Sequence, residues 1–195
     1  MKDKKFRELA KSRTNKAIKT IKLIGNLANK SHYAYTTDEA EQIINAIELR
    51  LKVQNLDKIP KIVAVSKTFQ LDKILPLIEY GHLDYGENKV QEAIEKWSDI
   101  KTKKKEINLH LIGKLQSNKA KFAVKIFDYI HSLDNEKLAK KVAEEQAKQK
   151  KNIKFFIQVN IGDEDQKSGV KKNQLNDFYY FCVKLNLNII GLMCI

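Results

Sequence analysis

From position 60 onward, short apolar runs alternate with longer segments in which apolar residues recur at helical spacing. The short runs are rich in β-branched residues and end in polar ones, which is typical of buried strands. The predicted strands cover residues 62–65, 82–85, 107–112, 126–130, 153–159 and 187–193. The predicted helices lie between them, at 71–80, 90–97, 115–124, 134–150 and 173–184. This alternation predicts parallel strands joined by right-handed helical crossovers.

Residues 1–56 have a different character, with apolar residues at helical spacing among many lysines, and they predict a helical hairpin. Residues 1–30 contain ten basic and two acidic side chains, and so carry +8 of the formal net charge of +13. Two interpretations stay open: a basic arm that binds RNA or another polyanion, and a solvated lysine face on a docking helix. The second is favoured, because no recognised nucleic-acid-binding motif accompanies the charge.

Composition narrows the class of protein. A length of 195 residues with 43% hydrophobic side chains suits one domain with an extension. The two cysteines, Cys182 and Cys194, fit neither a zinc site nor a disulfide framework, and we expect them to be reduced. No apolar run approaches the roughly 20 residues of a membrane span, and the first residues lack the apolar core of a signal peptide. We therefore expect a cytoplasmic protein without membrane contact.

Two architectures fit the alternation of strands and helices: a doubly wound open sheet and an eight-stranded barrel. Polar residues follow nearly every predicted strand, and a barrel gathers all such loops on one rim, whereas an open sheet spreads them. This favours the barrel. Only about six βα units are present, and a complete barrel typically has ~250 residues. The sequence therefore predicts an incomplete TIM-type (β/α) barrel at residues 57–195, preceded by a basic helical extension at residues 1–56.

Lys67 lies just beyond the first predicted strand, whose apolar run suggests burial on both faces. A charged residue there is well placed for chemistry, because α/β folds form their sites at the carboxyl ends of the strands. Arginine occurs only at positions 7, 13 and 50, so 34 of the 37 basic residues are lysines and position alone is weak support. Asn88 follows the second strand, where it could equally orient a ligand or cap the next helix.

Other chemistry is less well supported by the sequence. There is no dinucleotide-binding or P-loop glycine motif, and the loop at residues 162–169 is acidic and poorly suited to phosphate. Scattered histidines and carboxylates give no metal-binding pattern. His110 lies within a predicted strand and is interpreted as a hydrogen-bonded structural residue, whereas His131 is a weaker candidate for a role at the rim.

Six segments, taken together, resemble the pyridoxal-phosphate homeostasis protein family. They occur in the family's order and with sensible spacing, and a seventh begins at residues 191–193. They are residues 63–68 (VAVSKT), 86–93 (GENKVQEA), 110–119 (HLIGKLQSNK), 130–134 (IHSLD), 158–161 (QVNI) and 167–170 (KSGV). Six motifs in register are far more specific than any one of them.

The resemblance implies a barrel similar to the N-terminal domain of alanine racemase, with pyridoxal 5′-phosphate (PLP) held as a Schiff base on Lys67. Asn88 matches a residue near the pyridine ring, and Met193 matches one that packs beside it. The implied role is intracellular PLP (vitamin B6) and amino-acid homeostasis without catalysis, with PLP-dependent apoenzymes as candidate partners. The alternatives are a racemase-like PLP enzyme and an RNA- or polyanion-binding protein acting through residues 1–30.

The resemblance also sets an expectation for the carboxyl-terminal part of the barrel. The family continues past its Gly-Leu-Met segment with residues that hold the phosphate and face the pyridine nitrogen. This sequence ends at Ile195, so we expect a truncated barrel whose lysine binds the cofactor reversibly and weakly.

Overall fold

The computed structural model describes residues 42, 45, 60–162 and 168–194 of the chain. The predicted helical hairpin and the basic segment at residues 1–30 lie outside the described residues, apart from those two positions. The strands in chain order are β1 (Ala64–Val65), β2 (Asp84–Glu87), β3 (Asn108–Leu111), β4 (Tyr129–Leu133), β5 (Lys154–Asn160), β6 (Val170–Lys171) and β7 (Asn188–Met193). The helices are α3 (Leu71–Tyr80), α4 (Val90–Lys103), α5 (Ala120–Ile126), α6 (Glu136–Gln149) and α7 (Leu175–Lys184), with 3-10 turns η1 (Ser117–Lys119) and η2 (Lys172–Gln174).

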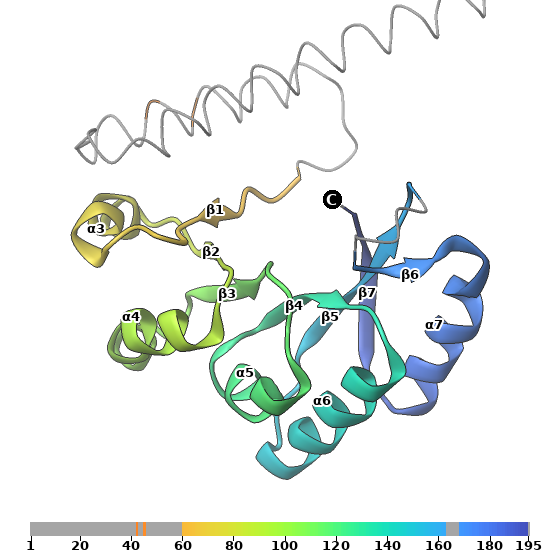
Figure 1. Ribbon diagram of the computed structural model, residues 1–195. Helices are drawn as coiled ribbons and strands as arrows, with labels where there is room; N and C mark the ends of the chain where they lie inside the picture. Colours follow the sequence, from red (N-terminus) through yellow and green to blue (C-terminus); the bar gives the residue numbers. More distant parts are fainter. Residues whose placement is uncertain (1–41, 43–44, 46–59, 163–167, 195) are drawn as a thin grey trace, which may run out of the picture.

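All strand pairs are parallel, as the alternation of strands and helices predicted. The strand order is β1-β2-β3-β4-β5, with β7 beside β5 and the short β6 against the end of β5. Figure 1 shows the helices in an arc around the curved strands. In the described part of the chain β1 and β7 are not paired with each other, so the sheet stays open. The predicted incomplete (β/α) barrel is confirmed.

Apolar residues from alternate strand positions and from the inner helix faces form one continuous core. The side chains of Leu109, Ile130, Phe155 and Ile157 have no measurable exposure. On α4, Trp97 is also fully buried, and its ring lies 4.7 Å from that of Tyr85 on β2, centroid to centroid. These contacts fix the helices against the strands and so fix the rim that the strand ends form.

Two helices illustrate how local sequence sets the boundaries. α3 has the predicted bounds and ends at Gly81, which adopts a left-handed φ of 99° and binds the last helical carbonyls through its N–H. α6 begins after Asn135, whose side-chain oxygen accepts a hydrogen bond of 2.9 Å from Leu138 N. Such caps satisfy backbone groups that a helix end leaves without partners.

Several predicted details are wrong, and the main ones concern the first strand, the lysine-rich segment and the fourth strand. The first strand is not buried on both faces, because β1 lies at the edge of the sheet and Val65 is 48% exposed. The lysine-rich segment at 101–105 is not entirely a loop, since α4 continues to Lys103. The fourth strand begins at Tyr129 rather than at residue 126, because Ile126 still belongs to α5.

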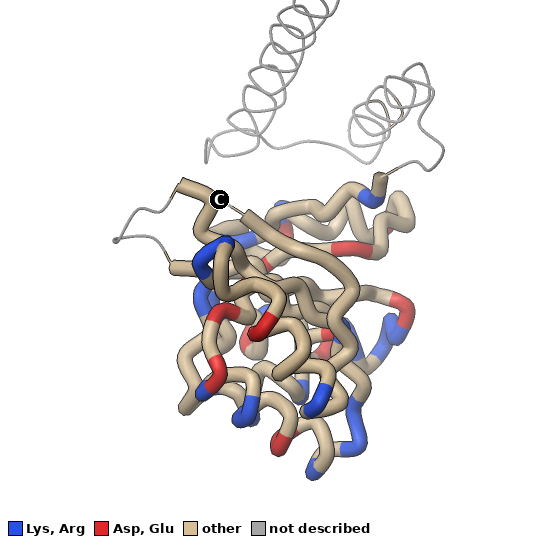
Figure 2. Tube along the Cα trace, turned by 90° about the vertical axis from the view of Figure 1, so that its right-hand side faces the viewer, with Lys and Arg blue, Asp and Glu red and all other residues tan. Residues whose placement is uncertain are grey.

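Charged residues of both signs are intermixed along the helices on the face shown in Figure 2. Pairs such as Lys89 with Glu92 and Lys141 with Glu144 lie one helical turn apart and contact each other at 2.5 and 3.2 Å. This is the pattern of a solvated helix surface. Within the described ranges, no helix combines the length and the apolar character needed to cross a bilayer.

We expect replacement of Trp97 by alanine to lower the free energy of unfolding by about 3–5 kcal/mol, because it removes a large, fully buried ring. Phe122→Ala is the matched control, because this aromatic residue on the neighbouring helix is 50% exposed and should change stability by about 0.5 kcal/mol or less. Urea unfolding followed by circular dichroism measures both. Equal losses in the two variants would contradict this assignment of the core.

Candidate functional site

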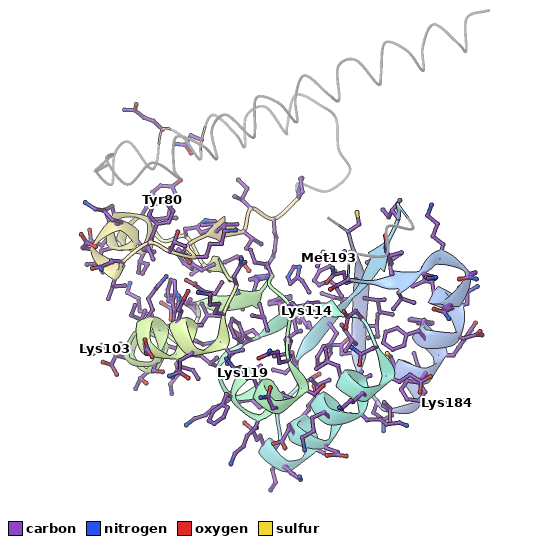
Figure 3. The ribbon with its side chains drawn as sticks, viewed as in Figure 1. Tyr80, Lys103, Lys114, Lys119, Lys184 and Met193 are labelled. Atoms are coloured by element: carbon purple, nitrogen blue, oxygen red, sulfur yellow. The ribbon has the colours of Figure 1, made fainter. Side chains whose placement is uncertain are left out.

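A cleft of about 550 Å³ lies where the strands end at their carboxyl termini. Its volume is within the range of roughly 300–1,000 Å³ that is usual for small-molecule sites. The cleft brings together Lys67, Asn88 and Met193, the three residues predicted from the sequence to bind the cofactor. Lys67 follows β1, Asn88 follows β2, and Met193 is the last residue of β7. Figure 3 labels Lys114 and Met193 on this side of the strands. The cleft is lined by Lys67, Asn88, Ile112, Gly113, Lys114, His131, Gln158, Ser168, Met193 and Cys194.

The backbone around Lys67 forms a tight turn in an uncommon conformation. Phe69 N donates a hydrogen bond of 3.3 Å to Ser66 O, so residues 66–69 form a four-residue turn. Thr68, its third residue, has a φ of 66°, where glycine or asparagine is usual and a β-branched residue is rare. Such a conformation costs on the order of 1–3 kcal/mol and persists only where the surrounding contacts enforce it. The half-buried Lys67 therefore sits in a turn that its surroundings constrain.

Asn88 is held in the cleft by the close approach of the next loop. Ile112 N donates to Glu87 O at 2.9 Å, and a Cβ on Gly113 would lie only 2.3 Å from Asn88 O. Only glycine fits this approach, which gives a physical reason for the Gly113 of the third motif. The alternative that Asn88 caps the next helix is wrong, because α4 begins after Lys89 and has no side-chain cap.

The opposite wall of the cleft comes from the end of β5 and the chain before β6. Gln158 Nε2 donates to Ser168 O at 3.0 Å and so ties the two segments together. Gly169 has a φ of 134°, and a Cβ there would lie 2.6 Å from Asn160 N. Residues 163–167, which include the acidic part of this loop, lie outside the described residues.

Two histidines and an aspartate form a hydrogen-bonded chain that ends at the cleft. His110 Nε2 lies 3.0 Å from Asp84 Oδ1, and His110 Nδ1 lies 2.9 Å from His131 Nε2. The His110 ring stacks on Tyr129 with centroids 4.1 Å apart, and the His131 ring stacks on Phe156 at 4.3 Å. Asp84 and His110 are buried, whereas His131 is half-buried and lines the cleft.

The direction of these hydrogen bonds follows from the carboxylate, which can only accept. His110 therefore donates from Nε2, and its Nδ1 accepts from His131 Nε2–H, which leaves His131 Nδ1 as an acceptor. Burial, together with a smaller effect of the neighbouring His110, lowers the pKa of His131 to about 4. Burial also lowers the pKa of His110, although its hydrogen bond to Asp84 opposes this change. These three hydrogen-bonded residues thus present the neutral imidazole of His131 to the cleft.

This chain of residues was not predicted, although both histidines were noted. The strand register explains it: His110 pairs with Tyr129, so His131 lies diagonally across on the same face of neighbouring strands. A sequence cannot supply that register by itself. Among the described residues, these three included, no group of three histidine, cysteine or acidic side chains is arranged to hold a metal ion.

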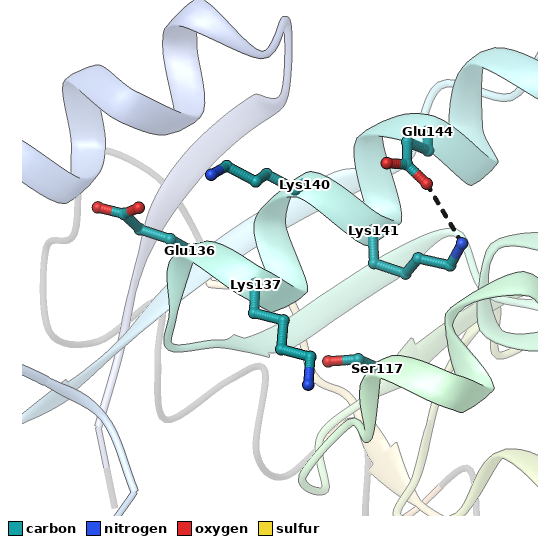
Figure 4. A pocket seen from close by; sticks show the side chains of 6 residues that line it. All are labelled: Ser117, Glu136, Lys137, Lys140, Lys141 and Glu144. Carbon is teal, nitrogen blue, oxygen red and sulfur yellow. Dashed lines mark hydrogen bonds and ion pairs between the residues drawn. The ribbon is translucent and has the colours of Figure 1, made fainter.

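A second concavity, of about 650 Å³, lies between η1 and α6 (Figure 4). Lys141 there contacts Glu144 at 3.2 Å and Glu145 at 3.4 Å. The three residues predicted to bind the cofactor, Lys67, Asn88 and Met193, do not line it. Its lining is Ser117, Glu136, Lys137, Lys140, Lys141 and Glu144. Its lysines therefore belong to a mixed-charge helix surface.

Fold and site together define an open (β/α) barrel domain with a lysine-containing cleft at the strand ends. The family model for the alanine racemase N-terminal domain matches residues 44–195. The chain belongs to this family.

Relatives with curated names are pyridoxal phosphate homeostasis proteins. That of Pasteurella multocida is 40% identical over 117 residues, which are 60% of this chain and 50% of the relative. That of Buchnera aphidicola is 39% identical over 150 residues, or 75% of this chain and 65% of the relative. The chain thus spans half to two thirds of the length of these relatives.

Solved structures agree with these relationships. PipY of Synechococcus elongatus with PLP bound has 33% sequence identity and a TM-score of 0.66, covering 77% of this chain and 69% of that one. An alanine racemase from Clostridium difficile shares the fold, with a TM-score of 0.58 at 14% identity over 76% of this chain and 39% of that one.

The lowered pKa of His131 predicts how stability depends on pH. Between pH 6.5 and about 4 the unfolded state binds a proton at this residue and the folded state does not, so stability falls as the pH is lowered through this interval. We expect His131→Phe, which keeps an aromatic ring beside Phe156, to lose less stability than the native chain over that interval. Urea unfolding across the pH range measures this, and parallel losses in both proteins would contradict it.

Proposed function

We propose that the chain binds pyridoxal 5′-phosphate in the rim cleft, with Lys67 as its covalent anchor. The observation that carries this proposal is the convergence of Lys67, Asn88 and Met193, from three separate strand ends, on one cleft. The curated relatives are named for PLP homeostasis, and the PipY structure was solved with PLP bound. Both support the proposal.

The residues of the cleft suit this ligand. The amine of Lys67 would attack the aldehyde carbon, with loss of water, to give a Schiff base. Ile112 and Met193 offer apolar surface to a flat ring, and the Met193 thioether adapts to an aromatic edge. Asn88 can both donate and accept hydrogen bonds toward ring substituents. Gly113 keeps Asn88 beside the cleft, so the polar and apolar walls are preorganised.

The role that we propose is intracellular PLP and amino-acid homeostasis, with the protein acting as a non-catalytic carrier. A Schiff base forms and hydrolyses reversibly, so a carrier can release its cargo, and PLP-dependent apoenzymes are the recipients that we propose. A cytoplasmic setting suits these partners. Because the chain spans only part of its relatives' length, this role of the whole protein is part of the proposal.

A racemase-like enzyme is a second candidate, and the neutral imidazole of His131 in the same cleft is the observation that favours it. Racemisation requires a group that takes a proton and another that returns it. Incubation of the chain and PLP with single enantiomers of amino acids, followed by chiral chromatography, distinguishes the two candidates. Turnover that disappears in His131→Phe would support the enzyme, whereas no turnover supports the carrier.

We expect borohydride to trap PLP on Lys67 when it is added to the chain mixed with the cofactor, because reduction makes the Schiff base permanent. Absorbance of the mixture reports formation of the Schiff base, and peptide mapping by mass spectrometry locates the modified lysine. Replacement of Lys67 by alanine should abolish specific trapping.

Lys114→Ala is the matched control, because Lys114 also lines the cleft and its loss should leave trapping on Lys67 intact. Modification of Lys114 or of surface lysines in place of Lys67, in the native chain, would contradict the proposed anchor.

A further inference from the structure

A buried ion pair lies behind the turn that carries Lys67. Glu87, the last residue of β2, has no exposed surface, and Lys96 on α4 contacts its Oε1 atom at 2.8 Å. The same oxygen accepts hydrogen bonds from Ser66 Oγ at 2.8 Å and from Trp97 Nε1 at 2.9 Å. Three donors, one from the turn after β1 and two from α4, therefore converge on one carboxylate oxygen.

Both Glu87 and Lys96 contact Ser66, the residue directly before Lys67. Ser66 N donates to Gly86 O at 2.9 Å, and Ser66 Oγ donates to Glu87. Ser66 O accepts a hydrogen bond of 2.7 Å from Lys96 Nζ, in addition to the bond from Phe69 N that closes the turn. The backbone N–H, the carbonyl and the side chain of Ser66 are thus all held.

The hydrogen bonds to Ser66 matter for Lys67 because the strand before it gives the turn little support. β1 has two residues and, in the described part of the chain, pairs with β2 alone. The turn after it contains the unfavourable φ of Thr68, which relaxes if the surrounding contacts weaken. A charged amine that bonds both the carbonyl and the carboxylate keeps the turn closed, because hydrogen bonds with ionised groups are the stronger kind.

We propose that Glu87 and Lys96 are positioning residues: they fix Ser66 and thereby aim the amine of Lys67 at the ligand in the cleft. Neither residue lines the cleft, so they act through the backbone and not through contact with the ligand. The inference rests on the proposed function, since it concerns how the anchor for PLP is held.

The test compares two lysine-to-methionine variants on the same helix. Lys96→Met keeps the buried aliphatic stem and removes the bonds to Ser66 O and Glu87. Lys101→Met is the control, because Lys101 makes an equivalent pair of contacts, with Ile126 O and with the carboxylate of Asp128, far from the Lys67 turn. Each variant is saturated with PLP and reduced with borohydride, and the PLP trapped on Lys67 is divided by the bound PLP that remains unreacted.

We expect the ratio of trapped to unreacted bound PLP to fall roughly tenfold in Lys96→Met, as for loss of a charged hydrogen bond, and to stay at the native value in Lys101→Met. A purely structural role would lower the number of folded, binding-competent molecules but leave this ratio unchanged. Circular dichroism checks that both variants are folded at the temperature used.

Ser66→Ala provides a second, milder variant, since it removes only the contacts of the hydroxyl, with Glu87 at 2.8 Å and with Gly86 O at 3.5 Å. The ratio should fall by less than in Lys96→Met. Native ratios in both Lys96→Met and Ser66→Ala would overturn the positioning role while leaving Lys67 as the anchor. Absence of trapping on Lys67 in the native chain would instead overturn the proposed function itself.

Discussion

One carboxylate oxygen, Oε1 of Glu87, joins the turn after the first strand, the second strand and α4 of this barrel. Because it is fully buried, its charge must be met by donors, and those donors come from the elements that shape the rim. Trp97 packs in the core and also donates a hydrogen bond to Glu87, so one side chain links the apolar core to this polar cluster. The order of the cleft therefore depends on a polar cluster on the outer side of the sheet.

Much of the fold could be predicted from residue patterns, because short apolar runs mark the strands and apolar residues at helical spacing mark the helices along nearly the whole described chain. α3 has the predicted bounds, since an apolar face and Gly81 both mark its limits. The start of β4 was misplaced because Ile126 continues the apolar run, although it still lies in a helix. Asp128 interrupts that run and accepts a hydrogen bond from Leu109 N on β3, a long-range contact that no local pattern shows.

The part of the site that could be predicted is the set of residues at the ends of the strands, because a barrel places these residues on one rim. Lys67, Asn88 and Met193 share a cleft because parallel strands bring their carboxyl ends together. The contacts that tune the cleft were not predictable, because they depend on register and on side-chain direction. His110 and His131 are neighbours only through the pairing of β3 with β4, and Glu87 was noted in a motif without any sign that its side chain turns toward α4.

The short edge strand β1 also has a consequence for how often the proposed cofactor site is formed. β5 is flanked by β4 and β7, whereas β1 has only β2 beside it in the described sheet, so its amide protons should exchange with solvent through smaller, more frequent openings. A ligand anchored at the end of β1 binds only the docked form and shifts that equilibrium toward it. The apparent affinity is then the intrinsic affinity reduced by the fraction of molecules in which the strand is docked.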